Sequence, residues 1–129
     1  MTFRAAKYIS IFSAITLLFW SQFFPAPAIE FKTTIESFGT IKAGTKVIKE
    51  FKFKNAGTDT LRITTVQASD GGTIAYWPKD PIPPKVKGII RVEFGYTETR
   101  RGFQDKSFTV ISNAENNPVV LHLKGYIKK

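Results

Sequence analysis

The residue types that most often carry chemistry are scarce in this sequence. It holds no cysteine and a single histidine, His122, which lies in VVLHLKG, a run whose alternation is typical of a β-strand. The absence of cysteine excludes disulfides, thiolate nucleophiles, zinc sites with cysteine ligands and iron–sulfur clusters. A lone histidine cannot form a metal cluster, so we expect neither a metal nor any other cofactor.

Residue spacing offers no catalytic arrangement either. His122 could be combined on paper with a serine and a carboxylate, but there is no G-x-S-x-G segment or other nucleophile motif. The carboxylates show no paired spacing that points to acid–base work, and no glycine-rich phosphate loop precedes a helix. We therefore expect a protein that is not an enzyme. We expect His122 to face solvent or to form local hydrogen bonds on its strand.

Aromatic and basic residues near two loops are the remaining candidates for a partner contact. Tyr76 and Trp77 lie beside the proline-rich segment 79–84 (KDPIPP), and Arg100 and Arg101 lie in the turn TETRRG. Aromatic and arginine side chains dominate protein interfaces. The same residues could instead close one end of a hydrophobic core and form a solvated hairpin tip, and both interpretations stay open.

The chain is basic, with a formal net charge of +9. Such a charge attracts anions, including nucleic acid, anionic lipid and acidic polymers. The basic residues are mostly dispersed, as in FKFK and IIRVEF, which is typical of the solvated face of an antiparallel sheet. Aromatic–basic interleaving also occurs in RNA-binding sheets. Because the N-terminus predicts export, we expect no nucleic-acid partner.

Residues 1–28 have the anatomy of a secretory signal peptide. Arg4 and Lys7 precede an apolar run, and residues 26–28 (APA) form an A-x-A pattern that predicts cleavage after Ala28. The alternative is an uncleaved anchor, because residues 8–24 reach the short end of the length that spans a bilayer, roughly 17–25 residues. Both interpretations send residues 29–129 across the membrane.

The remainder of the sequence alternates between strand-like runs and turn residues, with no amphipathic helix of useful length. Val47, Phe51 and Phe53 share one face of their run, Val66 breaks an alternation and indicates a bulge, and residues 79–84 cannot join a central strand. The expected strands cover residues 29–35, 46–55, 61–67, 73–77, 88–96, 103–112 and 119–127.

This pattern predicts one all-β domain, residues 29–129. Its expected fold is an antiparallel immunoglobulin-like β-sandwich of about seven strands, preceded by the N-terminal signal or anchor helix. A small closed barrel is the alternative.

Three motifs link the sequence to a known group of proteins: Phe38-Gly39-x-Ile41-x-x-Gly44, Phe53-x-Asn55-x-Gly57-x-x-x-Leu61-x-Ile63 and Ser112-Asn113-Ala114-x-x-Asn117-Pro118. Through them, residues 29–127 resemble an uncharacterised bacterial exported immunoglobulin-like family of unknown function, related in architecture to the major-sperm-protein and Hydin-type domains. The resemblance implies a sandwich behind a signal peptide or lipid anchor, in the periplasm or at the cell surface. It supplies no biochemical function.

The turn at residues 69–73 departs from that family. Its members typically carry Ser-Cys-Gly-Cys-Thr there, whereas this sequence has Ser-Asp-Gly-Gly-Thr. A metal, redox or disulfide role of the paired cysteines therefore does not carry over. We expect a turn after a bulged strand, with Gly71 and Gly72 free to adopt positive φ. The family also tends to have Pro-Gly where this sequence has Pro84-Lys85.

Together these observations predict a non-enzymatic exported interaction or structural module of the bacterial cell envelope. Its expected partner is another envelope or membrane protein, contacted at sheet edges and end loops by β-augmentation or loop docking. One alternative is an accessory subunit of a membrane complex, held in the inner membrane by residues 8–24. The other is a glycan- or anion-binding module that uses Tyr76, Trp77, Arg100 and Arg101.

Overall fold

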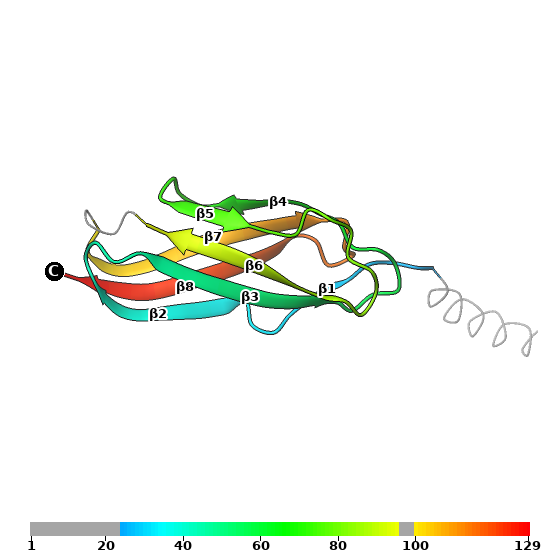
Figure 1. The fold of residues 1–129 in the computed structure, drawn as a ribbon, viewed down its shortest axis with the longest axis horizontal. Helices are drawn as coiled ribbons and strands as arrows, with labels where there is room; N and C mark the ends of the chain where they lie inside the picture. The colour runs from blue at the N-terminus through cyan, green and yellow to red at the C-terminus, as the bar shows by residue number, and fades with distance from the viewer. Residues whose placement is uncertain (1–23, 96–99) are drawn as a thin grey trace, which may run out of the picture.

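The computed structural model describes residues 24–95 and 100–129, so most of the predicted signal or anchor segment lies outside the described residues. Eight strands form two four-stranded sheets that face each other as a sandwich (Figure 1). Within those two ranges, no helix has the length and apolarity needed to cross a bilayer. Sheet A has the order β1 (Ile29–Phe31), β3 (Val47–Asn55), β6 (Lys87–Phe94), β5 (Thr73–Tyr76). Sheet B has the order β2 (Ile35–Lys42), β8 (Val119–Lys128), β7 (Gly102–Ser112), β4 (Ile63–Ala68).

One hydrophobic core fills the space between the inner faces of the sheets. The alternation in β3 turns Val47, Phe51 and Phe53 inward and Lys52 and Lys54 outward, as predicted. The other central strands alternate in the same way, and the largest fully buried apolar side chains are Phe51, Phe94, Phe108, Leu61, Ile90, Leu121, Leu123 and Ile127. Because two separate sheets enclose this core, the sandwich prediction is confirmed and the closed-barrel alternative is wrong.

The first predicted strand, residues 29–35, is in fact two strands in different sheets. β1 pairs antiparallel with β3, whereas β2 begins at Ile35 and pairs parallel with β8. Between them, the Thr33 hydroxyl donates to the Ile35 carbonyl at 2.6 Å and accepts from the Ile35 amide at 3.1 Å. Such local side-chain bonds favour a turn over a continuous strand. The sandwich therefore has eight strands, and the β2–β8 pair departs from the expected antiparallel arrangement.

The third predicted strand is bulged, as expected. The register of β4 with β7 shifts between Ile63 and Thr65. Leu61 lies outside β4 and forms an isolated bridge with Ile82, which is the only bridge that the described proline-rich segment makes. That segment stays out of the central sheet, as the missing N–H groups of proline require.

Asn55, from the second motif, joins three segments at one end of the sandwich. Its fully buried side chain donates from Nδ2 to the carbonyls of Asp59 at 2.7 Å and Ile82 at 3.0 Å, while Oδ1 accepts from the Gly57 amide at 3.0 Å. A Cβ on Gly57 would lie 2.2 Å from the Ala26 carbonyl oxygen, so only glycine fits there. These motif residues therefore shape the fold.

The first motif also has an architectural role. The Phe38 ring covers Gly125 of the neighbouring strand β8, where a Cβ would lie 2.3 Å from the ring. Gly39 follows with φ of 69°, in the left-handed region, at the point where β2 shifts register. The residues that carry the family resemblance therefore position strands and loops rather than reactive groups.

Candidate functional site

The turn after β4 holds a small ionic cluster. Asp70 Oδ2 accepts a short hydrogen bond from Lys106 Nζ, and Arg100 Nη1 lies 3.5 Å from the same oxygen. Lys106 belongs to β7, where it is 6% exposed and in phase with the inward residues Phe108 and Val110. The cluster thus occupies the turn where the family resemblance places paired cysteines.

The backbone of this turn is organised by Asp70. The Gly72 amide donates to Oδ1 at 3.3 Å, and the Thr73 hydroxyl donates to the Asp70 carbonyl at 2.9 Å. Neither Gly71 nor Gly72 adopts a positive φ, so that expectation is wrong, although the predicted turn is confirmed. A Cβ on Gly72 would lie 3.1 Å from Arg100 Nη2, so another residue there would require the end of the Arg100 side chain to shift slightly.

Opposing effects act on the pKa of Asp70. Partial burial raises it, but the hydrogen bond and charge of Lys106, the Gly72 amide and the charge of Arg100 together hold it below its ordinary value. The Phe94 ring lies beneath both cations, with its centroid 5.1 Å from Lys106 Nζ and 5.5 Å from Arg100 Cζ. Lys106 and Arg100 already neutralise the Asp70 carboxylate. The cluster is therefore suited to a structural role, in which it holds the turn against both sheets.

His122 lies on the outer face of sheet B. Its Nδ1 is 3.0 Å from Asp105 Oδ1, and Lys124 Nζ is 3.9 Å from Asp105 Oδ2. The local hydrogen bond matches the expectation for this histidine. No group of three histidine, aspartate or glutamate side chains that could hold a metal occurs in the described part of the chain.

The structure does not gather the four predicted contact residues into one site. Tyr76 ends edge strand β5 and stacks on Arg91, whose Cζ lies 4.7 Å from the ring centroid. Trp77 is half-buried against the core, which matches its interpretation as a core residue. Arg100 joins the Asp70 cluster, and exposed Arg101 donates to the Arg100 carbonyl at 2.7 Å. Arg100 contacts buried Phe94, which is opposite Thr73 at the start of β5, whereas exposed Tyr76 ends that strand.

Tyr76 instead belongs to an apolar patch on the outer face of sheet A. The patch consists of Ile48, Ile74, Tyr76 and Ile89, which are each between 43% and 53% exposed. Ile48 and Ile74 flank Glu93 from opposite sides in the strand register. Because Val47 faces inward, the alternation turns its neighbour Ile48 outward. The sequence pattern could not predict the patch, because the sheet order decides which strands are neighbours.

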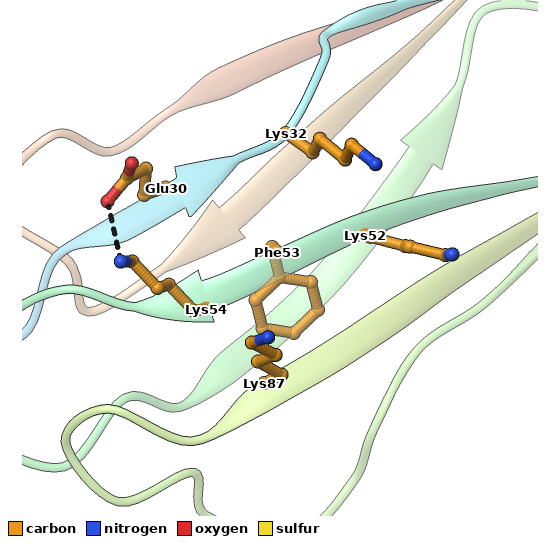
Figure 2. A pocket seen from close by; sticks show the side chains of 6 residues that line it. All are labelled: Glu30, Lys32, Lys52, Phe53, Lys54 and Lys87. Carbon is orange, nitrogen blue, oxygen red and sulfur yellow. Dashed lines mark ion pairs between the residues drawn. The ribbon is translucent and has the colours of Figure 1, made fainter.

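A basic groove continues on the same face (Figure 2). It has a volume of about 400 Å³ and is lined by Glu30, Lys32, Lys52, Phe53, Lys54 and Lys87. The lysines come from β3, from the start of β6 and from the residue after β1. The FKFKN run indicated an outward lysine face, and tertiary structure adds Lys32 and Lys87 to it.

The sheet order and the strand pairing together define an immunoglobulin-like β-sandwich. Over residues 29–127 the chain matches the family described as "Protein of unknown function (DUF1573)", and it belongs to that family. This confirms the resemblance to an uncharacterised immunoglobulin-like family. A search of curated proteins found no match.

Solved structures are similar in fold. A protein of unknown function from Porphyromonas gingivalis W83 aligns with a TM-score of 0.68 at 16% identity, over 78% of this chain and 46% of that one. This chain thus spans less than half of that protein. The ASH/PapD-like domain 7 of human CEP192 aligns with a TM-score of 0.64 at 10% identity, over 81% and 87% of the two chains. A chaperone–tip subunit complex of Acinetobacter baumannii Csu pili aligns at 0.52 and 13% identity, over 78% and 57%.

Proposed function

We propose that this protein is a non-enzymatic, exported module of the bacterial cell envelope that binds a partner protein through the apolar patch. The observation that carries the proposal is the Tyr76–Arg91 stack, bordered by three exposed isoleucines. A tyrosine and an arginine beside apolar side chains have the composition of an interface hot spot. Glu93 separates Ile48 from Ile74, so the Tyr76–Arg91 stack, and not a continuous apolar area, carries the proposal.

The sheet edges are less suited to this role than the apolar patch. β1 and β5, the edges of sheet A, are three and four residues long. β2 and β4, the edges of sheet B, are each interrupted by a register shift. Short and bulged edges are the devices that prevent strand addition. The expected β-augmentation therefore gives way in this proposal to contact through a sheet face.

The chemistry of the face defines its partner. A symmetric dimer through this face would place its lysines against their own copies, because a two-fold interface is self-complementary. A different envelope protein with an apolar surface and a carboxylate that faces Arg91 complements the apolar patch. The proposal includes no catalytic step. In support of this, the His122–Asp105 pair lies exposed on sheet B, whereas an active site usually excludes water from its reacting groups.

Site-specific photo-crosslinking in intact cells tests the proposal. A crosslinker at Ile74 should capture one partner, whereas a crosslinker at Val120, which is exposed on sheet B, should not. The purified partner should then bind Tyr76→Ala at least about tenfold more weakly than the original chain, as for a hot-spot residue. Thr64→Ala, on another exposed surface, should bind normally. Equal capture at both positions, or unchanged affinity of Tyr76→Ala, would overturn the proposal.

A second candidate, a subunit anchored by uncleaved residues 8–24, is supported by the contacts of residues 26–28. The amides of Thr58 and Ala56 donate to the carbonyls of Ala26 and Ala28, each at 2.8 Å. The Glu115 amide donates to the Pro27 carbonyl at 2.9 Å. Cleavage after Ala28 would remove all three acceptors from the folded domain.

The intact mass of the protein from native envelopes separates the two forms. An anchored subunit begins at its original N-terminus and stays with the membrane after a salt wash. A mature species that begins at Ile29 would exclude the anchor and leave the first candidate standing.

A further inference from the structure

We propose that the basic groove on sheet A is a second binding site, which takes a linear polyanionic glycan. The inference rests on three observations that are independent of the apolar patch: the register of the lysines, the imbalance of charge around them and the shape of the surface. The proposed site binds its ligand and catalyses no reaction.

The strand register sets like charges against each other. Lys54 is directly opposite Lys87 in the β3–β6 ladder, and Lys32 donates its backbone amide to the Lys52 carbonyl at 2.9 Å. Like charges directly opposite on a sheet are destabilising. Glu30, opposite Lys54 on the other side of β3, offsets one of these charges, and a bound anion would offset the others.

The groove carries an excess of cations. Its four lysines and one glutamate give a net charge of +3, and the Glu30 carboxylate pairs with Lys54 at 3.7 Å (Figure 2). Among the described residues, Lys32, Lys52 and Lys87 form no ion pair. Other cations of the described residues, such as Lys42, Lys49 and Arg62, also form no ion pair, so the groove is distinguished by the convergence of its lysines from three segments.

The dimensions of the groove favour a polymer over a single ion. Adjacent strands lie about 5 Å apart and successive outward residues about 7 Å apart, so the ammonium groups form an array across three strands. Figure 2 shows Lys32 and Lys52 extending in the same direction, away from the Glu30–Lys54 pair. An open surface of this kind cannot enclose one phosphate. A linear chain with a charge on each repeating unit can meet several lysines together.

Lysine is also the appropriate residue for such a ligand. Its ammonium is a flexible, hydrated point charge without the planar fork that arginine uses to select one phosphate or carboxylate geometry. A polymer whose charged groups vary in orientation is bound well by such side chains. The exposed Ile89, opposite Lys52 in the register, gives the array an apolar border on which sugar rings can rest.

Heparin oligosaccharide, a linear sulfated glycan, serves as the probe, with neutral dextran as its uncharged counterpart. The full chain in a zwitterionic detergent should bind heparin and not dextran. Lys32→Gln/Lys52→Gln/Lys87→Gln should weaken heparin binding at least about tenfold and reduce the slope of log affinity against log salt by about 2. The arginine variant at the same three positions should retain binding, which separates charge from loss of folding.

A matched control removes the same charge elsewhere. Lys42 and Lys128 face each other across β2 and β8, and Lys129 follows at the C-terminus, at the opposite end of the sandwich from β1 (Figure 1). The Lys42→Gln/Lys128→Gln/Lys129→Gln variant should change heparin affinity less than about threefold, because distant exposed charges are screened by salt. Equal losses in the two triple variants would show only non-specific attraction to a basic protein and would overturn the proposal.

Discussion

Lys106 of β7 and Asp70 of the β4–β5 turn form an ion pair on the inner side of sheet B, 36 positions apart in the sequence. The lysine is buried, whereas the carboxylate is partly exposed and also accepts from the turn itself. The pair occupies the place where the family resemblance implies two cysteines. An electrostatic link therefore holds a turn that has no cysteine with which to form a disulfide.

Asp70→Asn should lower the free energy of unfolding by about 2–3 kcal/mol, because it leaves the buried ammonium of Lys106 without a counter-charge. Urea denaturation monitored by tryptophan fluorescence measures this change. The double variant Asp70→Asn/Lys106→Met should recover most of the loss, since an apolar side chain of similar length needs no partner. Additive losses in the double variant would show that the two residues do not act as a pair.

The same pair predicts a pH dependence of stability. The folded-state pKa of Asp70 lies below its ordinary value of about 3.9, so its contribution is complete above that pH and is lost as the pH falls through the folded-state pKa. The difference in unfolding free energy between the original chain and Asp70→Asn should therefore be constant from pH 7 to 5 and shrink below pH 4. A difference that stays constant down to pH 2 would contradict the assigned cause.

Asn55→Ala should destabilise the domain by about 3 kcal/mol, because it leaves the Asp59 carbonyl and the Gly57 amide without their partner. The Ile82 carbonyl also loses one bond but keeps the Leu61 amide as a donor. Asn113→Ala is the control. Its side chain also makes two backbone hydrogen bonds, to Arg62 and Thr60, but at an exposed position where water replaces them. That change should cost about 1 kcal/mol. Equal losses would show that burial does not set the importance of these amides.

Lys85→Gly should stabilise the domain by about 0.5–1 kcal/mol. Lys85 adopts φ of 70°, which strains any residue with a Cβ, and glycine releases that strain at some cost in unfolded-state entropy. The family tends to have a glycine after this proline, and the positive φ at this position explains why. Lys85→Ala removes the same ammonium but keeps the strain, so its thermal midpoint should not rise. A gain in both variants would point to charge instead of backbone strain.

Some of the candidate sites could have been found from the alternation of residues. Lys106 is in phase with Phe108 and Val110, so the period of the strand already placed its ammonium on the inner face. The outward positions of Lys52 and Lys54 were predicted in the same way. Lys32 and Lys87 could not be assigned to the groove, because nothing local indicates that their strands lie beside β3.

The sequence by itself determined the class of the domain, the strands from residue 46 onward, and the inward and outward faces of β3 and β6. These properties follow from a two-residue period and from turn residues, which act over a few positions. Tertiary structure alone decided that residues 29–42 divide between two sheets, that β2 runs parallel to β8, that Asp70 meets Lys106 and that four lysines converge. Those outcomes depend on which strands pair and in which register, and pairing is set by burial of the whole core rather than by any local run of residues.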